Sequence, residues 1–238
     1  MNDKYFITED LFYDNKSLYK LSEPKNILIN KRNWFSLLKN YGWGKIKLCW
    51  RKILESNYFS LLECGGDGDC LFHVISEALN MDLIYNYEIP KYDISEIRKI
   101  ASEGITEDNF IIILESYKAE VEIGEFFGDW NPNEIQSIND LQIEILKLGN
   151  NFWGDHILLQ LLSEKLKINF IILNDENTNI SSMCNDLKFD KTIIIYYLEN
   201  LHFQLLGYFN GRIMQTIFNT NEIPLGLLKK YKEDTKKK

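Results

Sequence analysis

The sequence predicts an α+β fold in which a small, mainly antiparallel sheet is packed between helices. Apolar residues recur at helical spacing in the amino-terminal quarter and through the middle of the chain. Two runs typical of buried strands, 168–173 and 191–197, follow in the carboxyl-terminal half. Beyond them, Asn210-Gly211 separates the strand-like segments 202–209 and 212–218, and this dipeptide favours a hairpin because both turn positions need positive φ. We therefore expect the carboxyl-terminal half to supply the sheet and the middle to supply most helices.

Each helix is expected from its apolar spacing and from the residue that can cap it. A helical pair is predicted over residues 30–57, where apolar side chains recur three and four apart. A buried helix is predicted over 70–79, directly after the turn-rich stretch 65–69. Further helices are predicted over 93–103, 107–123, 138–148 and 156–166, and the expected N-caps are Asp93 or Ser95, Thr106 and Asp155.

The chain is expected to form one compact unit, because 238 residues of which 45% are hydrophobic suffice for one sizeable core. We divide it into a helical amino-terminal extension packed on the core (1–57), a main domain (58–220), and a short helix with a basic tail (221–238). The lysines of the tail are typical of a solvated chain end, so no function is assigned to them.

Composition disfavours several classes of protein. Lys+Arg 27 against Asp+Glu 35 give a net charge of −8, which disfavours a nucleic-acid-binding surface. The longest apolar runs fall far short of the roughly 18 to 20 residues that a membrane span needs. The first residues lack the basic and apolar regions of a secretory signal, and 4 irregularly spaced cysteines do not suggest a disulfide framework. We expect a soluble, monomeric, intracellular protein with reduced thiols.

Cys70 is the candidate nucleophile. It begins the predicted helix 70–79, and a helix amino terminus favours the thiolate through its partial positive charge and its N–H groups. Gly66 and Gly68 allow positive φ, so N–H groups of the loop 66–70 can converge on an oxyanion. These residues indicate acyl transfer, which also needs a general base.

The chain has 3 histidines, so the candidates for this base can be compared one by one. His73 lies three residues past Cys70 on the same predicted helix and is poorly placed to reach the sulfur, so we interpret it as structural. His156 follows Asp155 at a helix start, where a structural histidine is the commoner case. His202 follows the strand 191–197 after a short connection, and from there it can face a helix start across a cleft. It is the best candidate.

Two separated blocks resemble the ovarian-tumour (OTU) family of papain-like cysteine proteases, most of which are deubiquitinases. The segment 66–72, Gly-Asp-Gly-Asp-Cys-Leu-Phe, is similar to the family's nucleophile motif, Asp-Gly-Asn/Asp-Cys-Leu-Phe. Leu201-His202-Phe203 after an apolar strand is similar to its His-aromatic block. The segment 153–156, Trp-Gly-Asp-His, resembles the sequence that precedes that block. The resemblance spans roughly residues 58–210.

The resemblance implies a papain-like α/β fold and hydrolysis of isopeptide or peptide bonds at the carboxyl terminus of ubiquitin or a ubiquitin-like modifier. Ubiquitinated proteins would be its partners. Cys70 would be the nucleophile, His202 the general base and later acid, and Asp67 the acidic residue of the motif. Backbone N–H groups of Asp67, Gly68 and Cys70 would form the oxyanion hole. No cofactor and no metal are implied.

One position departs from the family pattern. The family often has Asp or Asn two residues after the histidine, where this sequence has Gln204. An amide oxygen of Gln204 could accept the imidazole N–H, but without a charge it would stabilise imidazolium less well. Asp67 or Asn200 could orient the imidazole instead, and the choice stays open. We predict that Gln204→Ala retains most activity.

Other uses of these residues have weaker support. A zinc site of Cys64, Cys70, His73 and a distant ligand would lack a second close pair of ligands. The glycines fit neither a calcium loop nor a phosphate loop, because the ligands those loops need do not follow. A rival hypothesis is a catalytically weak or inactive OTU-like module that binds ubiquitin or a partner protein. A third is a scaffold whose amino-terminal quarter docks a partner.

The abundance of Asn, Ile, Lys and Tyr suggests an AT-rich coding genome. Together with the resemblance, this fits an effector of a large DNA virus or an intracellular bacterium that removes host ubiquitin. The expected location is cytoplasmic, in the host cytoplasm for such an effector.

Overall fold

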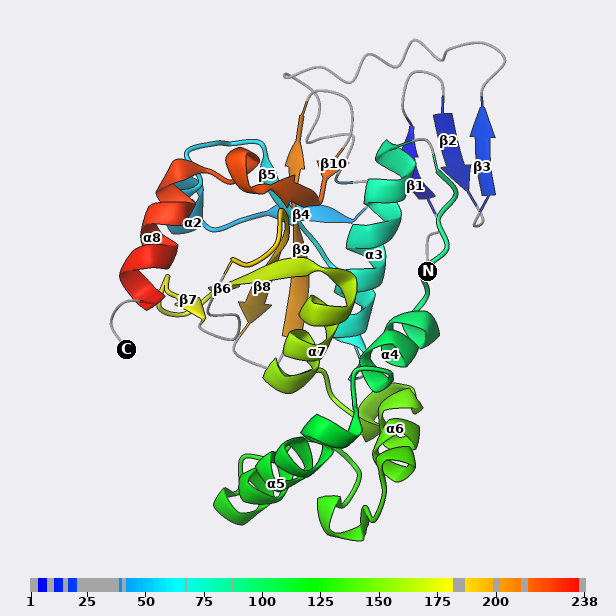
Figure 1. Cartoon of the computed structure of the whole chain (residues 1–238). Helices are drawn as coiled ribbons and strands as arrows, with labels where there is room; N and C mark the ends of the chain where they lie inside the picture. The colour runs from blue at the N-terminus through cyan, green and yellow to red at the C-terminus, as the bar shows by residue number, and fades with distance from the viewer. Residues whose placement is uncertain are drawn as a thin grey trace.

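The computed structural model describes residues 4–7, 11–14, 17–20, 39, 42–66, 68–86, 88–181, 187–198, 202–210 and 214–235. Its centre is a sheet with helices on both faces (Figure 1), which confirms the predicted α+β class. None of the helices within these ranges is long and apolar enough to span a membrane.

The main sheet is built from eight strands. They are β4 (Trp43–Lys45), β5 (Phe59–Leu62), β6 (Ile168–Asn174), β7 (Ile180–Ser181), β8 (Lys191–Leu198), β9 (His202–Phe209), β10 (Met214–Gln215) and β11 (Ile217–Asn219). Their order is β4-β5-β9-β8-β6-β7, with β10 paired to β9 and β11 to β8. Only the pair of β6 and β8 is parallel among these described strands. Because β4 and β5 precede Cys70, the sheet draws on both halves of the chain, and the expectation that the carboxyl-terminal half supplies it was incomplete.

The predicted hairpin around Asn210 is present as the pair of β9 and β10. Phe209 pairs with Met214, and Tyr208 with Gln215. The predicted strand 212–218 is divided, because β10 pairs with β9 whereas β11 pairs with β8.

The helices in the middle of the chain follow the prediction closely. The α-helices within the described ranges are α2 (Leu48–Ile53), α3 (Cys70–Tyr85), α4 (Ile94–Ser102), α5 (Glu107–Ile123), α6 (Ile138–Leu146), α7 (His156–Leu166) and α8 (Leu225–Thr235). Asp93 and Asp155 are N-caps of α4 and α7, each accepting a backbone N–H at 2.8 Å, and Thr106 caps α5 in a capping box. These caps satisfy N–H groups that a helix start leaves without partners.

The sheet is buried on both faces. Side chains of a strand point alternately to its two faces, and in β8 Ile193 and Ile195 pack in the cluster formed with α3 and α7. Ile194 and Tyr196 pack on the opposite face, in the cluster formed with α2 and α8. This explains the continuous apolar run of β8, which is typical of a strand covered on both sides.

The amino-terminal quarter differs from the prediction of a helical extension. Strands β1 (Lys4–Ile7), β2 (Leu11–Asp14) and β3 (Ser17–Lys20) form a separate antiparallel sheet. Within the predicted helical pair, most of the first helix lies outside the described residues, and α2 confirms the second. Residues 43–45, which lie between the two predicted helices, form the strand β4. The reason is tertiary, because Trp43 is 1% exposed and packs so closely on Gly207 of β9 that a Cβ there would lie 2.5 Å from its ring.

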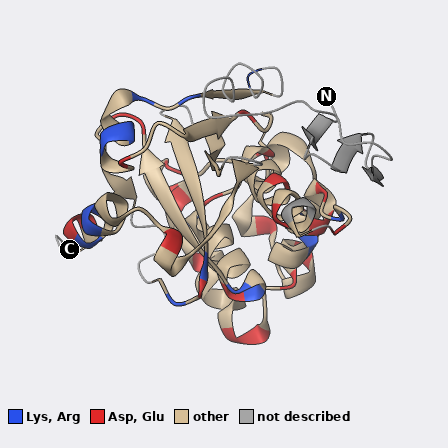
Figure 2. Ribbon diagram, turned by 90° about the horizontal axis from the view of Figure 1, so that it is seen from above, with Lys and Arg blue, Asp and Glu red and all other residues tan. Residues whose placement is uncertain are grey.

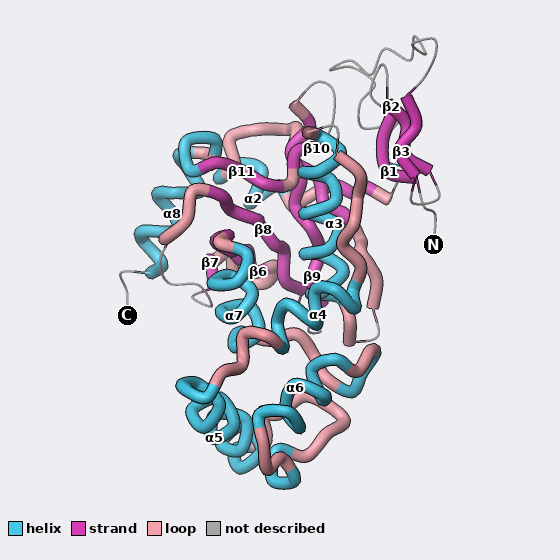
Figure 3. Tube along the Cα trace, turned by 45° about the vertical axis from the view of Figure 1, so that its right-hand side comes forward, coloured by secondary structure: helices cyan, strands magenta, loops and turns pink. Residues whose placement is uncertain are grey.

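The helices α5 and α6 extend beyond the edge of the sheet (Figures 1 and 3). They are joined to it by α4 and by the segment 147–155, which leads into α7. Among the residues that the structure describes, Lys and Arg are interspersed along the ribbon with Asp and Glu (Figure 2).

Candidate active site

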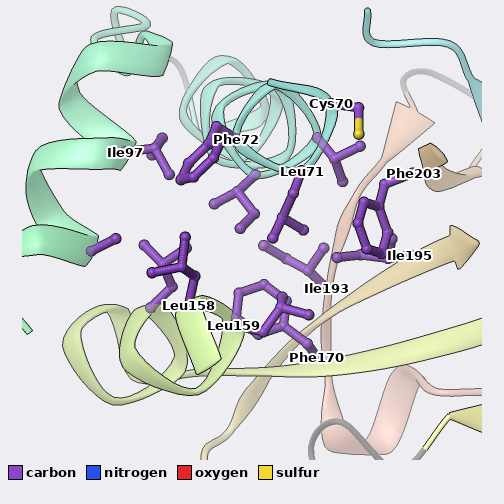
Figure 4. Close-up of a cluster of buried hydrophobic side chains, with 14 of the residues drawn as sticks. Cys70, Leu71, Phe72, Ile97, Leu158, Leu159, Phe170, Ile193, Ile195 and Phe203 are labelled. Carbon is purple, nitrogen blue, oxygen red and sulfur yellow. The ribbon is translucent and has the colours of Figure 1, made fainter. Parts of the chain in front are cut away.

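Cys70 is the first residue of α3, and 4% of its surface is exposed. Figure 4 shows it at the margin of the apolar cluster between α3 and the sheet, on the side of Phe203. Burial raises the pKa of the Cys70 thiol, and hydrogen bonds from the backbone N–H groups of Phe203, Leu71 and Cys70 lower it in part. The helix start thus supplies the expected N–H groups, but the thiol still needs a base near neutral pH.

The loop before Cys70 depends on glycine. Gly68 has a φ of +83°, and a Cβ atom on it would lie 2.4 Å from the carbonyl oxygen of Gly149. Both conformation and space therefore require glycine at this position. The Asp69 N–H donates to the carbonyl oxygen of Gly66 at 3.3 Å within the loop. Asp67 lies outside the described residues, so its predicted acidic and oxyanion-hole roles stay predictions.

A buried ion pair holds this loop in place. Asp69 Oδ1 accepts hydrogen bonds from Nε of Arg98 at 2.9 Å and from its Nη2 at 2.5 Å. Arg98 also donates to the carbonyl oxygens of Ile145 at 2.8 Å and Phe152 at 2.9 Å. Asp69 Oδ2 accepts the Gly149 N–H at 2.8 Å. One guanidinium therefore ties the nucleophile loop to the segment between α6 and α7.

The sequence analysis missed Arg98, although the sequence carries a signal for it. Arg98 falls on the apolar stripe of α4 formed by Ile94, Ile97 and Ala101, at helical spacing. A charged residue on a buried stripe needs a partner, because an isolated buried charge is costly. Its partner Asp69 stands beside the nucleophile.

The segment 153–156 lies against the start of α3. A Cβ atom on Gly154 would lie 2.5 Å from Cβ of Leu71. Glycine at this position therefore lets the chain pass close to the residue that follows the nucleophile.

His202 is the first residue of β9, where it pairs with Leu198 of β8. Its side chain is 24% exposed. The next residue, Phe203, packs with Cys70 in the cluster between α3 and the sheet (Figure 4), and its backbone N–H lowers the pKa of the Cys70 thiol. The start of β9 therefore brings the predicted base to the start of α3. Asn200, a candidate orienter, lies outside the described residues.

Glu63 is a residue of this site that the sequence analysis did not single out. It follows β5, and its Oε1 forms a hydrogen bond with Nε2 of His202. Its Oε2 accepts a hydrogen bond from Nε2 of Gln204 at 2.7 Å. The sequence held no signal for this contact, because it depends on the register of β5 on β9.

The other two histidines have different surroundings. His73 is half-buried, with its ring against Gly65, and burial lowers the pKa of its imidazole. His156 is exposed at the first position of α7, directly after the N-cap Asp155. This confirms the expectation of a structural histidine beside a helix cap. Within the described part of the chain, no three His, Cys, Asp or Glu side chains are grouped to hold a metal ion.

A cysteine at the start of a helix, with the start of a strand that carries a histidine packed beside it, supplies the two kinds of group that nucleophilic cysteine chemistry uses. The family model of the OTU-like cysteine proteases matches residues 65–205. The chain therefore belongs to the OTU family of cysteine proteases.

Two relatives and one solved structure illustrate the likeness. The L96 protein of Tipula iridescent virus, named as a ubiquitin thioesterase, is 28% identical over 189 residues, which are 78% of this chain and 20% of that protein. Ubiquitin thioesterase otu2 of Schizosaccharomyces pombe is 26% identical over 160 residues, 67% of this chain and 47% of that protein. A solved OTU domain in complex with ubiquitin has 19% identity and a TM-score of 0.48, covering 74% of this chain and 84% of that one. The chain thus spans less than half the length of either relative.

Proposed function

We propose that this protein is a cysteine-type deubiquitinase, which hydrolyses isopeptide or peptide bonds at the carboxyl terminus of ubiquitin or a ubiquitin-like modifier. The observation that carries the proposal is the packing of Phe203 beside Cys70 in one buried cluster (Figure 4), because it brings the start of β9, with His202, to the start of α3. Family membership supports the cysteine chemistry, and the names of the relatives support ubiquitin as the substrate.

The proposed reaction uses the two side chains in turn. His202 takes the proton of the Cys70 thiol, and the sulfur attacks the carbonyl carbon of the carboxyl-terminal residue of ubiquitin. Backbone N–H groups of Gly68 and Cys70, with that of Asp67, would stabilise the oxyanion. His202 then protonates the departing lysine amine. A water molecule that gives its proton to His202 hydrolyses the thioester and restores the thiol.

The first test is the intact mass of the protein after incubation with ubiquitin that carries an electrophile at its carboxyl terminus. We expect one ubiquitin-sized adduct on the wild type and none on Cys70→Ala. With a ubiquitin-lysine substrate, Cys70→Ala and His202→Ala should each lower kcat/KM on the order of 10³-fold or more, because the pair acts as a unit. A folded His202→Ala variant of wild-type activity would remove that residue from the mechanism.

The departure at Gln204 favours one alternative, a catalytically weak or inactive module that binds ubiquitin or a partner protein. It predicts that the wild type binds ubiquitin, in a titration followed by calorimetry, without forming the adduct. Adducts with electrophilic ubiquitin-like modifiers alone would instead identify the modifier. A monomeric state, the absence of nucleic-acid and membrane partners, and a cytoplasmic location stay predictions.

A further inference from the structure

Glu63 lies opposite Gln204 across the junction of two strands. β5 and β9 are antiparallel, and Leu62 pairs with Leu205, so continuation of this register places Glu63 beside Gln204. Directly opposed residues share a face of an antiparallel pair, as do residues two apart on one strand. Glu63, Gln204 and His202 therefore point to the same side, and both oxygens of the Glu63 carboxylate are engaged by the other two side chains.

We propose that Glu63 is the residue that positions the imidazole of His202, and that Gln204 in turn positions Glu63. This proposal rests on the proposed role of His202 as the general base. It moves the orienting acid from the position two residues after the histidine to the end of the neighbouring strand β5.

Gln204 and Glu63 have different roles in these contacts. Gln204 presents its amide nitrogen to Oε2 of Glu63, so it restrains the carboxylate. Glu63 is 52% exposed, and a side chain with that much access to water would sample several rotamers without such a restraint. The carboxylate carries the charge that Gln204 lacks, and this charge stabilises the imidazolium that forms when Cys70 is deprotonated.

The contact also selects the ring nitrogen that does the chemistry. Glu63 binds Nε2 of His202, so that nitrogen carries a proton when the imidazole is neutral. Nδ1 is then the basic nitrogen that can accept the proton of Cys70. Glu63 thus acts through His202, without a role on the substrate itself.

Steady-state kinetics with a ubiquitin-lysine substrate test the proposal. Glu63→Ala and Glu63→Gln should lower kcat roughly 10- to 100-fold with little change in KM, as for other groups that orient a reactive side chain. Gln204→Ala should lose about threefold or less, because Glu63 remains charged. Placing the acid at the family's usual position, in Glu63→Ala/Gln204→Asp, should restore most of the lost kcat. The matched control is Glu164→Gln on α7, because the Glu164 side chain is 48% exposed and forms a surface ion pair with Lys188.

A second readout does not depend on ubiquitin. The chain has 3 histidines, so ¹⁵N NMR of labelled protein, with His202→Ala for assignment, reports the tautomer of His202 alone. We expect the Nε2–H tautomer to dominate in the wild type and the two tautomers to mix in Glu63→Ala, with the melting temperatures of both proteins alike.

Kinetics and NMR together separate the two proposals. An inactive wild type that shows the Nε2–H tautomer, lost in Glu63→Ala, would overturn the deubiquitinase function and keep the positioning role. An active wild type whose kcat and His202 tautomer are unchanged by Glu63→Ala would overturn the positioning role alone. A third outcome would also overturn the positioning role of Glu63: Gln204→Ala lowers kcat as much as Glu63→Ala does, but leaves the His202 tautomer unchanged. Gln204 would then act on the reaction by a route other than Glu63.

Discussion

The nucleophile side and the base side of the candidate site are held by opposite means. On the nucleophile side, the ion pair of Arg98 and Asp69 has side-chain exposures of 0% and 12%. On the base side, the pair of His202 and Glu63 has exposures of 24% and 52%. The Asp69 carboxylate is held by the buried guanidinium of Arg98, whereas the Glu63 carboxylate is exposed to solvent.

Because of this difference, we expect substitutions on the two sides to affect different properties: the free energy of unfolding on one side and the rate of turnover on the other. A buried ion pair with several hydrogen bonds is costly to break, because the remaining partner is left charged and unsolvated. An exposed pair contributes little to folding, because water replaces either partner. We therefore expect changes on the nucleophile side to lower the free energy of unfolding, and changes on the base side to alter turnover in a folded protein.

The largest expected effect on stability is that of Arg98→Ala. It removes the partner of Asp69 and leaves the carbonyl oxygens of Ile145 and Phe152 without that donor. We expect the free energy of unfolding, measured by urea denaturation, to fall by about 3–5 kcal/mol. Lys99→Ala, at the next and exposed position of α4, is the matched control and should change it by about 0.5 kcal/mol or less.

If Arg98→Ala does not fold, Asp69→Asn provides a milder test, because it keeps the shape of the side chain and removes its charge. A loss of less than about 1 kcal/mol in a folded Arg98→Ala protein would contradict the comparison, because it is the size expected of a surface pair.

Gly68→Ala should have the next largest effect. The new Cβ would meet backbone atoms of Gly149 and Asn150 at 2.4–2.9 Å, and the residue would keep a φ of +83°. We expect a loss of roughly 1–3 kcal/mol in the same denaturation experiment. Turnover should also fall, because the N–H of Gly68 is a proposed oxyanion-hole donor.

Gly66→Ala is a stringent control for that substitution. It lies in the same loop, yet a Cβ on Gly66 would have no atom within 4 Å. Equal losses for Gly66→Ala and Gly68→Ala would show that the loop is not held as tightly as its contacts with Gly149 and Asn150 indicate.

The same contrast explains how far the sequence could predict the site. Cys70 and His202 could be proposed from the sequence because their signals are local: a glycine loop before an apolar helix, and a histidine after an apolar run. The helices 107–123 and 156–166 were predicted for the same reason, since spacing and caps are local properties.

What the sequence did not predict depends on pairing between distant segments. Glu63 meets His202 only through the register of β5 on β9, and register is set by the fold as a whole. Trp43 lies between the two predicted helices, and no strand was predicted there, because β4 depends on packing of Trp43 against Gly207 across the sheet. Arg98 lies between these cases, because its place on an apolar stripe is visible in the sequence and its partner is not.

The smallest expected effect is a difference between Cys70 and Cys64 in the pH at which their thiols become reactive. It does not involve a change in the free energy of unfolding. Burial raises the pKa of Cys70, and raises that of Cys64 well above its usual range, with the nearby Glu77 carboxylate adding to it. Cys70 has backbone N–H groups of Phe203, Leu71 and its own residue to stabilise the thiolate, whereas Cys64 has that of Leu205.

A higher pKa means less thiolate at a given pH, and the thiolate is the species that is alkylated. Alkylation by iodoacetamide, followed for each cysteine by peptide mass spectrometry, should therefore rise at lower pH for Cys70 than for Cys64. Both rates should increase with pH, and in urea the two profiles should converge. If exposure alone determined the rate of alkylation, Cys64 would react faster than Cys70, because 9% of Cys64 and 4% of Cys70 is exposed. If alkylation of Cys64 rises at lower pH than that of Cys70 in the folded protein, exposure of the sulfur affects the rate more than the N–H groups at the start of α3 do. The start of α3 would then stabilise the Cys70 thiolate less than its geometry indicates.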